Sequence, residues 1–435
     1  MNSFIQCCIE PDCQTEYGID ERLYVCSRCG GLLDVVLRDT VADADSLREL
    51  WRARKSSLDV RDRSGVWRFR EFLPFAEDVE VVSLGEGNTP LYEAPRSADY
   101  CRLSHLKLKH QGCNPTGSFK DTGMTVAVTQ ARRLGARFVA CASTGNTAAS
   151  LAAYAARAEL PCAIIVPGGQ VSHAKLAQAL DYGAKVLEVE GNFDSCMNVI
   201  RELCEDGAVY LVNSINPFRI EGQKTVAFEL AEQLEWRVPD HLVLPGGNLG
   251  NSSALGKGFR ELLRSGLIDR LPKITVVQAA GAAPFARFYR EHDAFVKEEH
   301  PQTLASAIKI GAPVSWPKAW RAVQETGGSV ITVTEQEIAD AKAVIGRDGI
   351  GCEPASATTV AGIRKLVSER AIKEDETVVA VLTGHLLKDT DYVMKYHSDS
   401  LIAPDGERLA SNFGNVPIKI EDPDFIRAIC GKIFQ

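Results

Sequence analysis

From Leu106 to about Ala280, apolar runs of strand length alternate with segments of helical pattern, and this alternation restricts the fold more than any other feature of the chain. Runs such as RFVACA, CAIIVP, KVLEVE, VYLVN, HLVLP and KITVVQA have the composition of strands buried on both faces. Between them we expect helices over 147–157, 172–181, 193–204 and 220–235. Farther on, SVITVT, EQEIADAKAVIG, PASATTVAGIRKLV and TVVAVLT continue the alternation. The pattern therefore predicts an α/β fold with a mainly parallel sheet.

Composition narrows the class of protein. The chain has 435 residues, which suits two or three domains with a large core. Its net charge of −8 argues against nucleic acid and anionic membrane surfaces as partners, and it contains no apolar run of the roughly 18 residues that span a bilayer. The N-terminal MNSFIQCC lacks the pattern of a secretory signal. The thirteen cysteines, an odd number, suit reduced thiols. We expect a cytoplasmic protein with no nucleic-acid or membrane partner.

The first eighty residues differ from the rest of the chain. Five of the thirteen cysteines lie within the first forty residues, which we expect to form a separate cysteine-rich module. The charged stretch over 43–80 predicts a surface-running connector with a short helix.

Three of the expected strands are followed by loops with more small polar residues than a connection requires. The loops are Ser143-Thr144-Gly145-Asn146-Thr147, Gly246-Gly247-Asn248-Leu249-Gly250-Asn251 and Thr383-Gly384-His385. Ligands of open α/β sheets bind beyond the carboxyl ends of the strands. We therefore expect the three loops to form one site at one edge of the sheet.

The loop over 246–251 has the features of a phosphate site. Its glycines permit close backbone approach, and the helix that follows directs free N–H groups at a bound anion. It is neither a P-loop nor a dinucleotide fingerprint. Taken alone, a plain strand-to-helix turn explains it equally well.

The segment NPTGSFKDTGM, residues 114–124, places a lysine at a helix start. Ser118 can cap the helix, and Lys120 then lies in the first turn, where the positive end of the helix dipole disfavours an ammonium group. This placement lowers the pKa of a lysine and favours a neutral, nucleophilic amine of the kind that forms Schiff bases. A solvated surface lysine is the alternative.

Two further segments offer anion-binding groups. The hydroxyls and amide over 143–147 precede a helix and can hold a carboxylate. In NSINPFRIEGQKT, residues 213–225, Arg219 and Lys224 lie close in sequence to Asn213 and Ser214 and can clamp a second phosphate. A capping loop and a solvated turn are the respective alternatives.

Taken in order, these motifs resemble those of pyridoxal-phosphate enzymes of the tryptophan-synthase-β type. NPTGSFKD, STGNT, GGNLGN, EPASA and LTGH occur in the family's order, and LGEGNTPL, SAIKIGAPVSWPKA and LTGHLLKD resemble the threonine synthases. The resemblance covers nearly the whole chain. It implies a two-domain α/β protein of pyridoxal-phosphate fold type II, with residues 1–40 as a zinc-ribbon-like module. Residues 41–110 would begin the large domain, 111–212 would form the small catalytic domain and 213–435 would complete the large one.

The resemblance also implies roles for individual residues. Lys120 would be the catalytic residue that forms the Schiff base with pyridoxal 5'-phosphate. Asn146 would bond the 3-hydroxyl oxygen of the cofactor, and Thr383 would face its pyridine nitrogen. The cofactor phosphate would lie in the loop of Gly246, Gly247, Asn248, Leu249, Gly250 and Asn251. Ser143, Thr144, Asn146 and Thr147 would bind the substrate carboxylate, and Asn213, Ser214, Arg219 and Asn248 the substrate phosphate.

The implied reaction is that of a carbon–oxygen lyase acting on a phosphate ester. O-phospho-L-homoserine would lose phosphate from Cγ and gain water at Cβ, giving L-threonine. An enzyme that uses O-phosphoserine, such as cysteate synthase, stays open, because one methylene separates the substrates. The two anion-binding loops argue against an amino-acid dehydratase of the same fold. Lys120 argues against a non-catalytic zinc-ribbon binding protein. The resemblance further suggests a homodimer.

The N-terminal cysteines have the spacing of a structural metal site. Cys26 and Cys29 form a C-x-x-C knuckle followed by two glycines. Cys8 and Cys13 complete a set of four, and Cys7 can replace Cys8. We expect a structural zinc ion; a ribbon that has lost its metal is the alternative.

Overall fold

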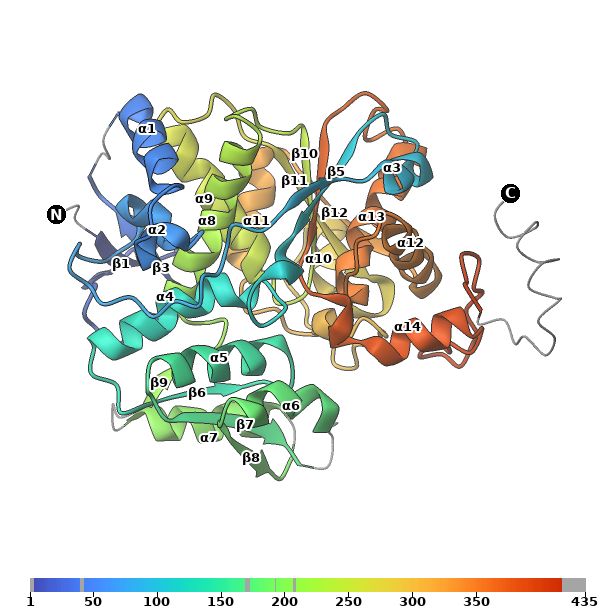
Figure 1. Cartoon of the computed structure of the whole chain (residues 1–435). Helices are drawn as coiled ribbons and strands as arrows, with labels where there is room; N and C mark the ends of the chain where they lie inside the picture. The colour runs from blue at the N-terminus through green and yellow to red at the C-terminus, as the bar shows by residue number, and fades with distance from the viewer. Residues whose placement is uncertain (1–3, 40–42, 169–172, 192, 206–208, 417–435) are drawn as a thin grey trace.

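The computed structural model describes residues 4–39, 43–168, 173–191, 193–205 and 209–416, and within them the strands form three sheets (Figure 1). The largest sheet has the order β12-β11-β10-β13-β5-β4, parallel except for β4 at its edge. Its strands are β4 (Leu91–Glu93), β5 (Leu106–His110), β10 (His241–Pro245), β11 (Lys273–Ala279), β12 (Ser329–Val333) and β13 (Val378–Leu382). The predicted parallel α/β arrangement is confirmed.

Helices cover both faces of this sheet, and its central strands β10 and β13 are buried along their whole length. On one face lie α3 (Pro95–Cys101), α12 (Glu335–Arg347) and α13 (Pro354–Ser368); on the other lie α1 (Ala44–Arg54), α8 (Pro217–Gln233) and α9 (Gly250–Arg264). Leu242 and Leu244 face the second group, whereas Val243 between them faces the first. The period of two along a strand produces this division.

The second sheet is fully parallel, with the order β8-β7-β6-β9. Its strands are β6 (Phe138–Ala142), β7 (Cys162–Pro167), β8 (Lys185–Val189) and β9 (Val209–Leu211). One face packs on α4 (Lys120–Arg133), α5 (Asn146–Arg157) and α6 (His173–Asp181), the other on α7 (Phe193–Glu205). These elements lie below the larger sheet in Figure 1 and fall within the predicted small domain, whose boundaries stay a prediction.

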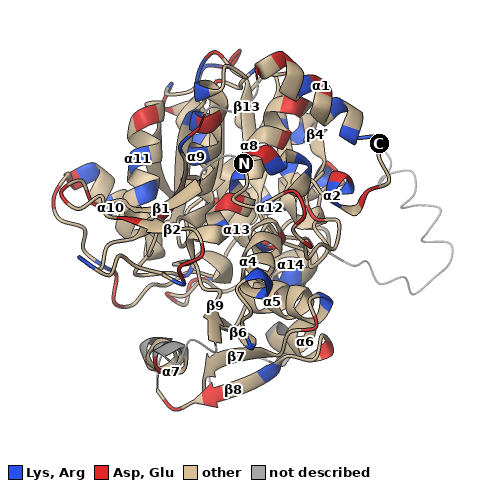
Figure 2. Cartoon of the chain, turned by 90° about the vertical axis from the view of Figure 1, so that its left-hand side faces the viewer, with Lys and Arg blue, Asp and Glu red and all other residues tan. Residues whose placement is uncertain are grey.

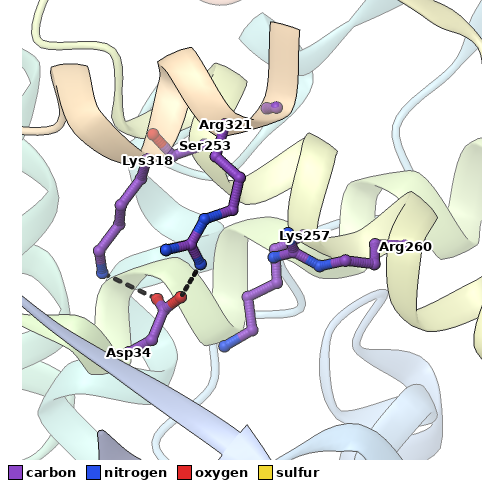
Figure 3. Close-up of a pocket in the computed structure, with 7 residues that line it drawn as sticks. Asp34, Ser253, Lys257, Arg260, Lys318 and Arg321 are labelled. Carbon is purple, nitrogen blue, oxygen red and sulfur yellow. Dashed lines mark hydrogen bonds and ion pairs between the residues drawn. The ribbon is translucent and has the colours of Figure 1, made fainter. Parts of the chain in front are cut away.

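The N-terminal residues form a small antiparallel sheet of β1 (Phe4–Cys8), β2 (Glu16–Gly18) and β3 (Leu33–Leu37), in the order β2-β1-β3. It docks on the larger body through charges (Figure 3). Asp34 on β3 pairs with Lys318 at 2.8 Å and faces Arg321 at 3.9 Å, both on α11 (Trp316–Thr326). Lys257 on α9 donates to the carbonyl of Val35. Basic and acidic segments are interspersed along α1, α9 and α11 (Figure 2).

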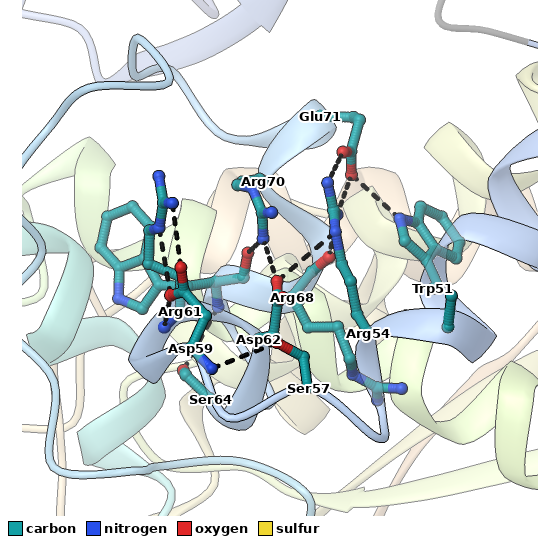
Figure 4. Close-up of polar contacts among 12 residues, drawn as sticks. Trp51, Arg54, Ser57, Asp59, Arg61, Asp62, Ser64, Arg68, Arg70 and Glu71 are labelled. Atoms are coloured by element: carbon teal, nitrogen blue, oxygen red, sulfur yellow. Dashed lines mark hydrogen bonds and ion pairs between the residues drawn. The ribbon is translucent and has the colours of Figure 1, made fainter.

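The expectation of a surface-running connector with a short helix over 43–80 fits residues 43–63, which are mostly exposed or half-buried and include α1, but it is wrong for residues 64–74, which are largely buried. Trp51 on α1 and Trp67 and Phe69 on η1 (Trp67–Phe72) are at most 1% exposed and belong to the cores of the large body. Their charged neighbours neutralise one another within the segment (Figure 4): Arg54 pairs with Glu71 and lies 3.5 Å from Asp62. The tryptophan and phenylalanine residues between the charged ones were the feature of the sequence that indicates burial.

The remaining helices are short or peripheral. They are α2 (Val60–Arg63), α10 (Pro284–Glu291) and α14 (Thr390–His397). Among the described residues, none of the helices combines the length and hydrophobicity needed to cross a membrane.

Helices α4 and α8 cross at a very short distance. A Cβ on Gly222 would lie 1.9 Å from the carbonyl oxygen of Thr122, and a Cβ on Gly123 would lie 2.8 Å from the carbonyl oxygen of Arg219. Only glycine permits the two backbones to approach in this way. The contact places the first turn of α4 beside the first turn of α8.

We predict that Gly222→Ala destabilises the protein by about 2 kcal/mol or more, because the added methyl group forces the helices apart and outweighs the higher helix propensity of alanine. Gly346→Ala on α12 is the matched control, since its added Cβ meets nothing within 4 Å; there we expect up to about 1 kcal/mol of stabilisation. Urea unfolding measures both. Equal stabilities of the two variants would contradict the role of the crossing.

Candidate active site

The three polar loops come from two different sheets, the six-stranded and the four-stranded one, so the expectation that they share an edge of one sheet is wrong. The loop over 143–147 follows β6 in the smaller sheet, whereas the loops after β10 and β13 belong to the larger one. Two of them, the loops after β6 and β13, nevertheless meet at Glu353. Its Oε2 accepts a hydrogen bond from Asn146 Nδ2 at 3.0 Å, and its Oε1 is hydrogen-bonded to Thr383 Oγ1 at 3.1 Å.

The loop before Lys120 is bonded to the loop after β13. The N–H of Phe119 donates to the carbonyl of Thr383, and the N–H of His385 donates to the carbonyl of Gly117, each at 2.9 Å. Gly117 has a φ of +85°, which glycine adopts without strain. This short backbone ladder brings Lys120 and Thr383 to the same place.

Asp121 anchors the same loop from the other side. Its buried carboxylate accepts hydrogen bonds from the N–H and the hydroxyl of Thr116, at 2.7 and 2.6 Å, and from the hydroxyl of Ser150 on α5, at 2.6 Å. Burial raises its pKa to about 6, against the opposing effect of these donors. Asp121 thus connects the loop before Lys120 to α5, the helix that begins with Asn146.

Lys120 is the first residue of α4, and Arg219 lies in the first turn of α8. Loss of solvent lowers its pKa to about 7, helped by the nearby charge of Arg219 and opposed by Glu353. Its Nζ lies 4.1 Å from the centroid of the Phe119 ring. The amine is therefore partly neutral near pH 7, as a nucleophilic lysine requires.

Arg219 is 2% exposed and lies in the first turn of α8. Among the described residues it has no carboxylate partner; its guanidinium donates only to the carbonyl of Val212, at 3.4 Å, and its buried Nε makes no hydrogen bond. Burial lowers its pKa to about 10. A buried cation at the positive end of a helix dipole is unfavourable unless an anion binds beside it.

The loop between β10 and α9 has the geometry of a cradle. A Cβ on Gly246 would lie 2.6 Å from Val276, whereas a Cβ on Gly250 would meet nothing closer than 3.8 Å. Leu249 adopts a left-handed conformation with φ of +64° at the start of α9. The buried Nδ2 of Asn251 has no hydrogen-bond partner. Asn248 is held by Ser214 Oγ, which accepts from its Nδ2 at 2.6 Å, and by the N–H of Val314, which donates to its Oδ1 at 2.7 Å.

The residues predicted to bind substrate differ in burial and in their contacts. Ser143, Thr144 and Thr147 are half-buried around Gly145, beside which a Cβ would meet open space. Asn213 is buried, and its amide forms two hydrogen bonds with the backbone of Ala142, at 3.0 and 3.1 Å. Asn213 therefore supports the strand end that leads into Ser143. Its contact with a substrate phosphate stays a prediction.

Glu353 has no role in the sequence-based prediction, although the motif EPASA that contains it is recognised. It is 4% exposed and occupies the N-cap position of α13, where its side chain makes no capping hydrogen bond. Burial raises its pKa, against the opposing effects of Asn146, Thr383, Lys388 and Lys120. The sequence signal was a glutamate directly before a helix that begins with proline; its contacts with two distant loops depend on the fold.

At the N-terminus, the sulfurs of Cys8, Cys13, Cys26 and Cys29 all lie within 4.8 Å of one another. Cys7 lies outside this group, and its thiol is directed at the carbonyls of Cys8 and Gln14. The N–H of Gly31 donates to Cys29, and the hydroxyl of Tyr17 lies 3.1 Å from Cys26. Four converging sulfurs at such distances suit a tetrahedral ion.

Comparison with known proteins identifies the class. Residues 82–384 match the family of pyridoxal-phosphate dependent enzymes. The threonine synthase of Methanocaldococcus jannaschii is 46% identical over 90% of this chain and 94% of its own length; that of Methanosarcina acetivorans is 48% identical over 89% and 93%. The chain therefore belongs to the pyridoxal-phosphate-dependent enzymes. Within them it is a member of the threonine synthase family, which confirms the resemblance found in the motifs.

Solved structures share the fold. Threonine deaminase isoform 2 of Solanum lycopersicum superposes with a TM-score of 0.61 at 21% identity, covering 82% of this chain and 90% of its own. Maize serine racemase gives 0.59 at 21% identity, covering 79% and 95%. At this identity the likeness concerns the fold alone, and it confirms the predicted fold type II.

In the cofactor-free protein, we predict that the amine of Lys120 titrates near pH 7 and that Arg219→Gln raises this midpoint, because it removes a neighbouring positive charge that favours the neutral amine. The rate at which an amine-directed reagent labels Lys120, followed by mass spectrometry as a function of pH, measures the midpoint. Arg237→Gln, at an 83% exposed side chain, is the control. An unchanged midpoint in Arg219→Gln would contradict the coupling.

Proposed function

We propose that this protein converts O-phospho-L-homoserine and water into L-threonine and phosphate, as a carbon–oxygen lyase acting on a phosphate ester. One observation carries the proposal: Lys120 and Arg219 are two cations with depressed pKa values in the first turns of two adjacent helices, and Arg219 has no carboxylate partner among the described residues. Such a site gains most from an anionic ligand. A phosphorylated amino acid supplies the anion, and a nucleophilic lysine suits its chemistry.

The residues present fit pyridoxal 5'-phosphate. The loop over 246–251, with glycine at three of its six positions and the unpartnered Nδ2 of Asn251, suits the cofactor phosphate. Lys120 supplies the amine for the covalent link. Asn146 and Thr383 supply hydrogen-bonding groups for the 3-hydroxyl oxygen and the ring nitrogen. When bound, the cofactor stabilises negative charge at the substrate carbons from which protons are removed.

The chain's own residues transfer the protons and bind the substrate. The amine of Lys120, with its pKa near neutrality, takes a proton from Cα and moves protons at Cβ and Cγ. Ser143, Thr144, Asn146 and Thr147, at the start of α5, bind the substrate carboxylate. Arg219, with Ser214, Asn213 and Asn248, holds the substrate phosphate and stabilises it as it leaves Cγ. Asp121 keeps the lysine loop in place.

A relative that uses O-phospho-L-serine, such as cysteate synthase, is the second candidate. The same lysine, carboxylate loop and phosphate clamp would serve it. The family relationship favours the first reaction, since the curated relatives at 46 and 48% identity carry the name threonine synthase. An amino-acid dehydratase has no use for a buried arginine directed at a second phosphate.

The reaction is tested by product analysis of the cofactor-loaded protein. We expect O-phospho-L-homoserine to give phosphate and L-threonine in equal amounts and Lys120→Ala to give neither. We expect Arg219→Gln to weaken substrate binding by about tenfold or more, as the loss of a charged hydrogen bond does, and Arg237→Gln to act as the wild type. Turnover of O-phospho-L-serine with sulfite, without turnover of O-phospho-L-homoserine, would decide for the second candidate.

We further propose that Cys8, Cys13, Cys26 and Cys29 bind one structural zinc ion. Four thiolates leave no open coordination position, so the ion takes no part in catalysis. We also propose that the protein acts in the cytoplasm, where thiols stay reduced, and that it forms a homodimer, which sedimentation of the purified protein tests.

We predict that Cys26→Ser loses the zinc and unfolds at a lower temperature, because the ion holds the two halves of the N-terminal module together. Cys7→Ser is the matched control and should keep one zinc per chain, since its sulfur lies outside the cluster. Elemental analysis and thermal unfolding measure both variants. Equal zinc contents in the two variants would refute the assignment of the ligands.

A further inference from the structure

Glu353 joins the two residues that we assign to the 3-hydroxyl oxygen and to the nitrogen of the cofactor ring. Its carboxyl group contacts Asn146 from the smaller body and Thr383 from the larger one, through different oxygens. Its own N–H donates to the carbonyl of Gly384 at 3.0 Å, which holds the start of α13 against the loop after β13. The side chain is therefore placed by the fold, and it does not move freely within the site.

The hydrogen bonds of Ser356 determine what Thr383 can do. Ser356 Oγ accepts from the N–H of Thr383 at 2.8 Å and from the N–H of Gly384 at 3.2 Å, so both of its lone pairs are used. Its hydroxyl hydrogen is left for Thr383 Oγ1, at 3.1 Å. Thr383 thus accepts one hydrogen bond already and has one lone pair and one hydrogen left for Glu353 and the ring nitrogen.

The surroundings of Glu353 favour an uncharged carboxyl group. It is buried, its two hydrogen-bond partners are a neutral amide and a neutral hydroxyl, and among the described residues it forms no ion pair within 4 Å. The charged groups that face it are Lys120 from α4 and Lys388 from η5 (Leu386–Lys388), and the thiol of Cys352 is its chain neighbour. The two lysines favour the carboxylate, but neither lies within ion-pair distance, and burial without an ion-pair partner favours the neutral form of a carboxyl group.

We propose that Glu353 is a positioning residue that carries a proton, donates it in a hydrogen bond to Thr383 and so directs the hydroxyl hydrogen of Thr383 at an unprotonated pyridine nitrogen. The carbonyl oxygen of the same carboxyl group accepts from Asn146. This orients the amide so that its second N–H faces the 3-hydroxyl oxygen. The inference rests on the cofactor site of the proposed function and adds the residue that sets its hydrogen-bond directions.

The consequence is a ring that withdraws electrons weakly, because its nitrogen gains a hydrogen bond and no proton. The proton transfers of the reaction then depend on Lys120, whose amine is partly neutral near pH 7. A deprotonated Glu353 would instead take the hydrogen of Thr383 and leave a lone pair facing the ring, which suits a protonated nitrogen.

The test is spectroscopic and uses the cofactor-loaded protein without substrate. In the infrared, a neutral carboxyl group has a C=O stretch that is separate from those of carboxylates. We expect this band in the wild type at pH 7 and its loss in Glu353→Gln. Glu369→Gln, at an exposed side chain at the end of α13, should keep it. With cofactor labelled by ¹⁵N in the ring, we expect the resonance of an unprotonated nitrogen in the wild type. Absence of the band, or a protonated nitrogen, would overturn the inference.

Substitutions of Glu353 distinguish a positioning role from a purely structural one. Glutamine reproduces one acceptor and one donor, so Glu353→Gln should bind the cofactor within about threefold of the wild type. Glu353→Ala should bind it about tenfold more weakly, because both hydrogen bonds are lost. Equal losses in the two variants would count against a neutral carboxyl. If Glu353→Gln does not fold, Glu353→Asp replaces it and should shift the band. Failure to turn over O-phospho-L-homoserine would leave these spectra unaffected, so the two proposals fail separately.

Discussion

Helices α4 and α8 approach so closely that the carbonyl oxygen of Thr122 occupies the space of a side chain on Gly222. This crossing places the first turns of the two helices, with Lys120 and Arg219, side by side. Each cation also lies at the positive end of a helix dipole, in surroundings from which water is largely excluded. Burial depresses the pKa of both groups, and the charge of Arg219 lowers the pKa of Lys120 further. The cost of burying these cations is what a bound anion offsets.

The other half of the site is neutral. Asn146, Glu353, Ser356 and Thr383 form a continuous chain of hydrogen bonds that ties α5 of the smaller body to α13 and β13 of the larger one. Positive charge therefore lies where the substrate phosphate is expected, and uncharged donors and acceptors lie where the aromatic ring is expected. This separation suits a ligand with a charged phosphate and a ring whose electronic state depends on single hydrogen bonds.

The N-terminal module is connected to this site through α11. Asp34, on the strand that pairs with the cysteine-bearing β1, is bound by Lys318. At the same, N-terminal end of this helix, the N–H groups of Val314 and Ser315 donate to Asn248 in the predicted phosphate loop. The module thus braces an element that holds the loop, a structural role in keeping with four sulfurs that leave no position for a substrate.

The sequence by itself determined the strands, most helix positions, the lysine motif and the glycine loop, because these depend on periodicity and on short-range conformational preferences. It also limited the cysteine cluster to Cys13, Cys26, Cys29 and either Cys7 or Cys8. Only the tertiary structure decided that the fourth is Cys8, that the polar loops come from two sheets, that Trp51 and Trp67 of the charged stretch are buried, and that Glu353 joins Asn146 to Thr383. These facts depend on contacts between residues far apart in the chain, such as the 207 positions between Asn146 and Glu353. No local pattern encodes such a distance, since it results from the packing of the whole chain.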